Sequence, residues 1–260
     1  MLQKRAAAPS VGPSARYGCC EGEFPRRTSA SALRCMDQAE KVSGSRCPVL
    51  IVGEAGTDLD EWAQRIHRIN GPSAGPWFRI DCRQLDDGMA AYRLFGHEAG
   101  GSPMSPGRSL GALRAARGGT VLLSDLPSLP ISTQVQLSRV FRDHEVRPVG
   151  AQRSESIDVR ILATSHQRLR DLTAARGIHV DLARLLVGAE IKVPSLRESV
   201  EDIPCLVDHY SRRFAARYRR PVWRPTVSEL ESLCRQRWPG NDRQLAEVVE
   251  RVYAFDCAVG

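Results

Sequence analysis

The chain has 260 residues, of which 42% are hydrophobic and 26% are charged, and its formal net charge at pH 7 is +7; this suffices for one large domain or for a large and a small one. No apolar run approaches the roughly 18 residues of a membrane span, and no apolar centre marks a signal peptide, so we expect a cytoplasmic protein without a membrane partner. The eight cysteines lack metal-ligand spacing, which predicts neither a metal site nor a disulfide frame.

The N-terminal part of the chain changes character near residue 31. Residues 1–30 are rich in Ala, Ser, Pro, Gly and Arg and show no periodicity, which predicts a disordered leader. A helical pattern follows from Ser31 to Val42. A short buried strand is expected at Val49 to Val52, and a helix from Glu61 to Ile69.

The turn between this strand and this helix has the layout of a phosphate-binding loop that lacks its lysine. The pattern G-x-x-x-x-G-K-[ST] maps onto Gly53 to Asp60, which places Asp58 at the second glycine, Leu59 at the lysine and Asp60 at the hydroxyl residue. Two carboxylates would face the polyphosphate, with no cation to answer it, and each like-charge contact costs on the order of a kcal/mol or more. The pattern predicts an ATPase fold whose catalysis has decayed.

The next segments alternate between strands and helices. Apolar strands are predicted at Trp77 to Cys82, at Gly119 to Asp125 and at Asp158 to Thr164. A weak helix begins at Ala90 and gives way to a loop rich in Gly, Pro and Ser, and a clearer helix runs from Ser132 to Asp143. Strands separated by helices predict an α/β fold with a parallel sheet and helices on both faces.

From Val200 onward every periodic segment is helical. Helices are expected from Ile203 to Tyr218, from Thr226 to Arg235 and from Asp242 to Phe255. We therefore predict an α/β core over residues 31–197 and a small, all-helical lid over residues 198–260.

Several segments resemble, in their order and spacing along the chain, the central AAA+ domain of sigma-54-dependent transcriptional activators, also called bacterial enhancer-binding proteins. They are Pro48-Val-Leu-Ile, Gly53-Glu-x-Gly-Thr57, Leu94-Phe-Gly-His-Glu98, Gly118-Gly-Thr120, Pro194-x-Leu-Arg-Glu198, Glu201-Asp-Ile-Pro204 and Trp238-Pro-Gly-Asn-x-Arg243. The resemblance implies an AAA+ P-loop fold with a C-terminal helical lid. It also implies a bacterial, ring-forming ATPase that remodels RNA polymerase bound to sigma-54.

Carried over position by position, the resemblance implies a nucleotide site. Its residues would be Gly53, Glu54, Ala55, Gly56, Thr57, Asp58, Leu59 and Asp60 of the phosphate loop, with Arg243 as the sensor arginine of the lid. Ser124 stands at the magnesium-binding aspartate, Asp125 at the glutamate that orients the attacking water, and His166 in the sensor pair. These departures predict weak binding of ATP or ADP, no magnesium site, and impaired or absent hydrolysis.

The implied contacts with other proteins also depart from the family. The arginine fingers would fall at His179 and Leu185, and Arg184 lies one residue from the second position. The sigma-contacting loop aligns with Gly100 to Ser105, where only the first glycine matches, so we expect no direct sigma-54 contact of the family's kind. No helix-turn-helix is expected within the 260 residues.

We predict a transcription-regulatory pseudo-ATPase that acts by association with AAA+ relatives in a ring. Two alternatives stay open. An active ATP-hydrolysing activator would use relocated residues, with Arg184 and Asp125 replacing the usual ones. A nucleic-acid-binding protein would use the arginine-rich helix between Arg212 and Arg220, although a solvated helix face explains the same charges. A decayed remnant fits the same losses.

Overall fold

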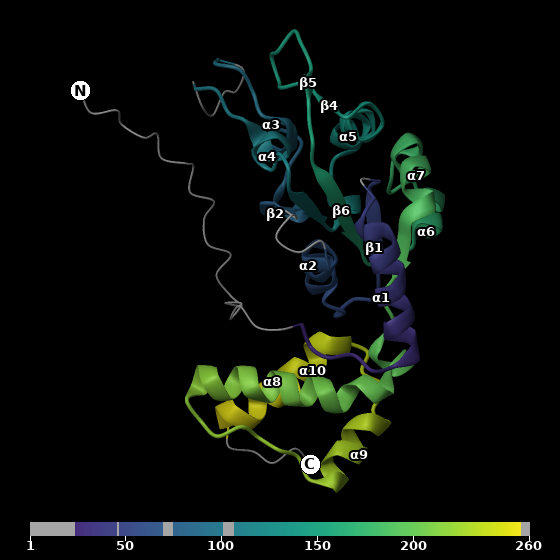
Figure 1. The fold of residues 1–260 in the computed structure, drawn as a ribbon, viewed down its shortest axis with the longest axis vertical. Coiled ribbons are helices and arrows are strands. Elements are labelled where there is room, and N and C mark those ends of the chain that lie inside the picture. Colours follow the sequence, from purple (N-terminus) through teal and green to yellow (C-terminus); the bar gives the residue numbers. More distant parts are fainter. Residues whose placement is uncertain (1–23, 46, 70–74, 101–106, 256–260) are drawn as a thin grey trace, which may run out of the picture.

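The computed structural model describes residues 24–45, 47–69, 75–100 and 107–255. Its centre is a five-stranded sheet in the order β2-β3-β6-β1-β7, in which every neighbouring pair is parallel. Figure 1 shows helices around this sheet and a separate group of helices, α8 to α10, below it. The strands are β1 Val49–Val52, β2 Trp77–Asp81, β3 Thr120–Ser124, β6 Arg160–Ser165 and β7 Glu190–Lys192. The predicted parallel α/β fold is confirmed.

The sheet separates two apolar layers. Side chains of a strand alternate between faces, so Leu50 and Val52 pack into one cluster while Val49 and Ile51 pack into the other. Both clusters are buried, which explains why β1 is a continuous apolar run in the sequence. Helices α1 Ala30–Ser43 and α2 Leu59–Ile69 cover one face, and the other carries α3 Ala90–Phe95, α4 Gly111–Ala115, α5 Ile131–Asp143, α6 Leu169–Ala174 and α7 Val180–Leu186.

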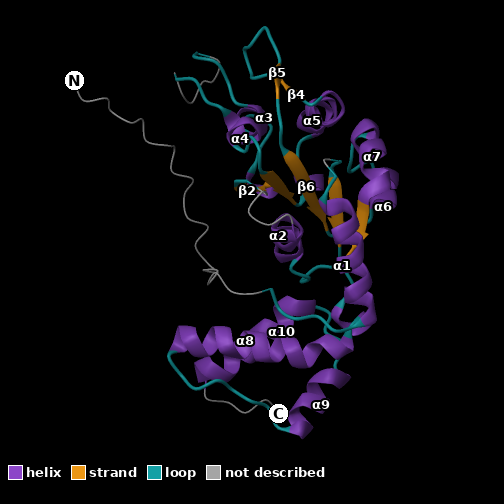
Figure 2. Ribbon diagram, in the orientation of Figure 1, coloured by secondary structure: helices purple, strands orange, loops and turns teal. Residues whose placement is uncertain are grey.

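The C-terminal helices form their own apolar core. Helices α8 Ile203–Tyr218, α9 Val227–Arg235 and α10 Asn241–Phe255 lie together, apart from the strands coloured in Figure 2. Trp238 is buried among them and donates its indole N–H to the Leu233 carbonyl at 2.8 Å. We refer to this helical part as the lid. Among the described residues, no helix is long and apolar enough to cross a membrane.

Several elements lie outside the sequence expectations. The short antiparallel pair β4 Glu145–Val146 and β5 Glu155–Ser156 and the edge strand β7 were not predicted, because two or three residues carry too little periodicity. The helices α4, α6 and α7 are five to seven residues long and were also missed. The loop predicted at residues 101–105 lies outside the described residues.

The predicted disordered leader must be shortened. Residues 24–29, here called the strap, run along the start of α1, and within them Arg27 and Ser29 are buried. Ser29 caps α1 by accepting the Ala32 N–H at 3.2 Å. The strap is ordered by distant partners in the lid, so its local composition held no signal of this. Residues 1–23 lie outside the described residues.

Candidate functional site

The predicted phosphate loop lies where β1 ends and α2 begins, at the carboxyl edge of the parallel sheet. Gly53 donates its N–H to the Ser165 carbonyl of β6 at 3.2 Å, and His166 Nδ1 lies 3.2 Å from the Gly53 carbonyl oxygen. Thr57 folds back on the loop, with its hydroxyl 2.6 Å from the Glu54 carbonyl oxygen. The sheet therefore brings the loop and His166 together, as expected for ligand sites at this edge.

The lysine position holds a buried apolar side chain. Leu59 is only 4% exposed and packs in the apolar cluster beneath α2, with Trp62 and Val193. One of its methyl groups lies so close to Gly53 that a Cβ on that glycine would be 2.8 Å away. The side chain thus fills the base of the loop and brings no positive charge to it.

Asp60 has a cationic partner that the sequence expectation missed. Arg79 on β2 places its Nε 2.5 Å from Asp60 Oδ2, and Ser124 at the end of β3 donates its hydroxyl to Asp60 Oδ1 at 2.6 Å. Of the two carboxylates expected to face a polyphosphate, Asp60 is therefore already paired with a cation of the chain itself. Phosphate-loop patterns do not include β2, and the only hint was an arginine inside the otherwise apolar run from Trp77 to Ile80.

These three residues do not fit a magnesium ion. A magnesium site needs oxygen ligands free to bind the ion in octahedral geometry. Here the Ser124 hydroxyl and the Asp60 carboxylate bond each other, and the Arg79 guanidinium brings its positive charge to the same carboxylate. A second cation at this point would face repulsion from Arg79.

Asp58 acts as a helix cap in place of the loop glycine. Its Oδ1 accepts the Glu61 N–H at 3.1 Å, which satisfies a donor at the start of α2. Burial raises the pKa of Asp58, and burial together with the neighbouring Asp58 raises the pKa of Glu61 to about 8. The N-terminus of α2, which would attract a phosphate group, thus already carries acidic side chains.

The lid contacts the loop through the start of α10. Arg243 donates its backbone N–H to the Gly56 carbonyl at 3.0 Å, and Asn241 donates its side-chain amide to the Ala55 carbonyl at 2.9 Å. Gly56 has a φ of +86°, and a Cβ there would lie 2.0 Å from the Gly240 carbonyl oxygen. Only glycine fits this close approach. The predicted sensor residue Arg243 therefore reaches the loop through its backbone, while the residue as a whole is exposed.

A second lid contact reaches the other end of the loop. Arg197, in the short turn that leads into the lid, forms a bidentate ion pair with Glu54. The pair lowers the pKa of Glu54. Because both side chains are almost half exposed, solvent weakens this pair, and we assign it positioning rather than a large stabilising energy.

The predicted catalytic residues have local partners. Asp125 directly follows β3 in a left-handed conformation with φ 59°, and it accepts the Ser128 hydroxyl at 2.6 Å. Arg184 lies on α7 with its side chain 76% exposed, 3.6 Å from Asp181. His179 caps the same helix by accepting the Asp181 N–H at 3.4 Å. The part of the sigma-contacting loop at residues 101–105 lies outside the described residues.

The raised pKa of Glu61 predicts a pH dependence of stability. Its ordinary value is 4.5, so between pH 4.5 and about 8 the folded state holds a proton that the unfolded state has released. Stability must therefore fall as pH rises through this window, by on the order of 1 to 2 kcal/mol for this group. Glu61→Gln should flatten the fall in urea-unfolding midpoints between pH 5 and 8. The exposed Glu247→Gln is the control, and an unchanged slope in Glu61→Gln would contradict the assignment.

Comparison with known proteins gives matches over almost the whole described chain. Residues 26–192 match the family described as the Sigma-54 interaction domain, and residues 197–257 match the AAA+ ATPase lid domain. The transcriptional regulatory protein GlrR of Escherichia coli K12 is 35% identical over 223 residues, which are 86% of this chain and 50% of GlrR. The response regulator PilR of Pseudomonas aeruginosa is 34% identical, covering 86% of this chain and 50% of PilR. The chain spans about half the length of these curated relatives.

Solved structures agree with the fold. NtrX from Brucella abortus in complex with ATP superposes with a TM-score of 0.77 at 28% identity, covering 87% of this chain and 49% of NtrX. The ADP complex of the same protein superposes with a TM-score of 0.78 at 27% identity, covering 90% of this chain and 52% of NtrX. The predicted AAA+ P-loop fold with a helical C-terminal part is confirmed.

Proposed function

The chain belongs to the sigma-54 interaction domain family, and from this premise we propose that it regulates bacterial transcription by associating with AAA+ relatives rather than by hydrolysing ATP. The observation that carries the proposal is the occupation of the catalytic positions. Leu59 fills the lysine position with a buried apolar side chain, and Asp60, Arg79 and Ser124 satisfy one another where a metal ion would bind. Such a protein would work in the cytoplasm.

We further propose that nucleotide binding is weak and independent of magnesium. NtrX has been crystallised with ATP and with ADP, and the loop here keeps Gly53, Glu54, Gly56 and Thr57 of the family's pattern. Against this stands the Asp58 carboxylate at the start of α2, with no lysine or metal ion to offset it. Millimolar affinity is therefore the most that we expect.

Association with relatives would use the surfaces that the family uses for ring formation. A subunit placed in a ring must supply an arginine finger to its neighbour, and the finger positions here hold His179 and Leu185. A ring that contains this chain would therefore have an incomplete site at one interface. We propose that the chain acts as an inhibitor of active rings.

The other two readings have weaker support. An active ATPase would need Asp125 and Arg184 at the reaction, but these side chains pair with Ser128 and Asp181. A nucleic-acid surface would need free arginines on α8. Arg212 pairs instead with Asp208 at 2.8 Å and Arg217 with Glu250 at 2.9 Å, which reduces the positive charge available for phosphate contacts.

The proposal is tested by mixing this chain with the sigma-54 interaction domain of E. coli GlrR and measuring ATP hydrolysis. We expect hydrolysis per GlrR subunit to fall as the chain is added, because each incorporated copy leaves one interface without a finger. Leu185→Arg should relieve the inhibition by restoring an arginine at a finger position, whereas Arg184→Ala should not; melting temperatures of both variants verify folding. Unchanged GlrR hydrolysis at about tenfold excess of the chain, far above the 1:1 ratio of a ring interface, would refute the proposal.

A further inference from the structure

The strap, residues 24–29, touches the core and the lid at once. On the core side, the Phe24 ring packs edge-on against Trp62 of α2, with ring centroids 5.2 Å apart, and the Arg65 guanidinium lies 4.4 Å over the Phe24 ring. Trp62 is almost fully buried. Aromatic and cation–π contacts of this kind attach the beginning of the strap firmly to α2.

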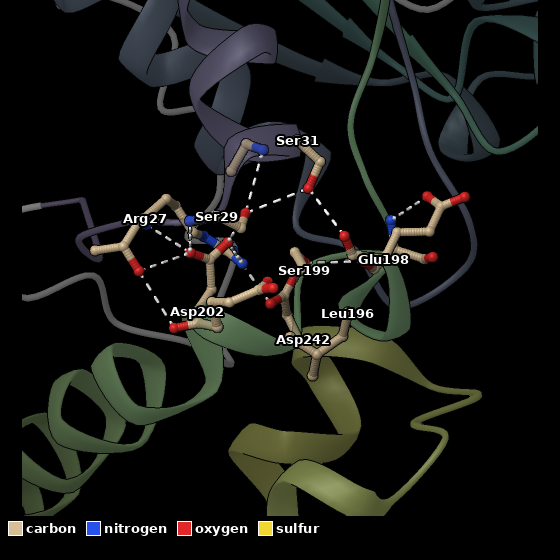
Figure 3. Close-up of polar contacts among 12 residues, drawn as sticks. Arg27, Ser29, Ser31, Leu196, Glu198, Ser199, Asp202 and Asp242 are labelled. Carbon is tan, nitrogen blue, oxygen red and sulfur yellow. Dashed lines mark hydrogen bonds and ion pairs between the residues drawn. The ribbon is translucent and has the colours of Figure 1, made fainter.

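On the lid side, the strap is held by one buried carboxylate. Asp202, just before α8, is fully buried and accepts the Thr28 N–H at 2.6 Å, the Ser29 N–H at 2.7 Å and the Ser29 hydroxyl at 2.7 Å. Figure 3 shows these bonds converging on Asp202, with Ser31 reaching the Glu198 carbonyl beside them. Strap and lid are thus joined by charge-assisted hydrogen bonds to a fully buried carboxylate.

Arg27 adds a second, ionic connection to the lid. Its guanidinium lies 3.1 Å from Asp242 Oδ1 and 4.0 Å from Asp202 Oδ2, and the Arg27 and Asp242 side chains are both 4% exposed. The same guanidinium lies 5.9 Å from the centre of the Trp62 ring, on the core. A buried arginine that pairs with two lid carboxylates and rests on a core tryptophan resists separation of the two parts, because separation would break these contacts together.

Asp242 connects this ion pair to the phosphate loop. It precedes Arg243, whose N–H bonds the Gly56 carbonyl, and it follows Asn241, whose amide bonds the Ala55 carbonyl. Burial raises the pKa of Asp242, and Arg27 and the backbone N–H of Asp58 act in the opposite direction. The Asp58 N–H is one of the donors at the beginning of α2, where an anion is favoured.

We propose that the strap locks the lid closed on the core without nucleotide, with Arg27 joining Asp202 and Asp242 of the lid to Trp62 of the core. A bound nucleotide at the loop would touch the same two parts, since Gly53 to Asp60 belong to the core and Asn241 to Arg243 to the lid. In this chain, residues of the strap make this contact between the core and the lid. The lock does not depend on whether the domain hydrolyses ATP or joins a ring.

Amide hydrogen exchange on the full chain tests the lock, with the Arg243 amide as the reporter because it bonds the Gly56 carbonyl across the junction. We expect strong protection of the start of α10 without nucleotide and the same protection with millimolar ATP or ADP. A lid that is unprotected alone and becomes protected on adding nucleotide would overturn the proposal.

The decisive variant is Arg27→Met, which removes the charge but keeps an unbranched side chain. Exchange at the start of α10 should speed up by about tenfold or more, while amides of β3 and β6 keep their protection. The neighbouring Arg26→Met is the matched control, because Arg26 is exposed, and it should leave exchange unchanged. Equal exchange in Arg27→Met and wild type would exclude a role of Arg27 in holding the lid.

A second variant keeps the test sound if Arg27→Met does not fold. The double variant Arg27→Met with Asp242→Asn removes both partners of the 3.1 Å ion pair, while Asp202 keeps its hydrogen bonds from Thr28 and Ser29. We expect it to fold, with the same loss of protection at the start of α10. Wild-type protection in the double variant would contradict the lock.

Discussion

Replacing Asp202 with alanine is expected to lower the free energy of unfolding by about 3 to 5 kcal/mol, the usual cost of removing one partner from a buried, charged network. The substitution leaves the Thr28 and Ser29 N–H groups without their acceptor and removes one of the two carboxylates that face Arg27. Urea unfolding of the full chain, followed by far-UV circular dichroism, measures the change.

The control for this substitution is Asp208→Ala, which also removes a carboxylate from the lid. Asp208 is exposed on α8 and pairs only at the surface with Arg212, so its loss should cost less than about 1 kcal/mol. The loss of unfolding free energy in Asp202→Asn should lie between those of Asp202→Ala and Asp208→Ala, because an amide oxygen still accepts one N–H. A cost for Asp202→Ala no larger than that for Asp208→Ala would show that the strap contributes little to stability.

Restoring a glycine and a lysine in the phosphate loop should produce the largest change in nucleotide binding. In Asp58→Gly with Leu59→Lys, we expect the affinity for ATP to rise by about 100-fold, which corresponds to roughly 3 kcal/mol. Removing the Asp58 carboxylate relieves like-charge repulsion worth on the order of a kcal/mol, and the lysine adds a charge-assisted contact worth about 1.5 to 3 kcal/mol. Isothermal titration calorimetry measures both variant and wild type.

The matched control is Asp58→Gly with Leu59→Met, which relieves the repulsion but adds no cation. Its affinity should rise by about tenfold only, as expected for the repulsion term alone. If the lysine variant folds and binds no better than this control, the lysine position does not face the nucleotide, and the assignment of Leu59 to that position is wrong.

Much of the fold was predictable because its elements are locally determined. The strand at Val49 to Val52 and the helix from Ile203 to Tyr218 agree with the structure to the residue, since one is a continuous apolar run and the other has clear helical periodicity. The edge strand β7 was missed because its three residues include the polar Glu190 and Lys192. Its pairing with β1, not its composition, makes it a strand.

The site was predictable only where its residues are consecutive in the sequence. The loop from Gly53 to Thr57 was identified from its glycines. The Arg79 partner of Asp60 was not, because their contact depends on how β2 lies beside β3 at the end of the sheet. Arg27 and Asp242 are 215 positions apart in the sequence, so no local pattern predicts that they pair.

Absence of ATP hydrolysis is the central claim, and turnover by the purified full chain tests it most directly. Phosphate release is measured at high protein concentration with millimolar ATP and magnesium. We predict no release above background, because Leu59 brings no cation and because Asp60, Arg79 and Ser124 do not fit a magnesium ion. Magnesium-dependent turnover that disappears in Asp125→Ala would contradict this and identify the chain as an active ATPase.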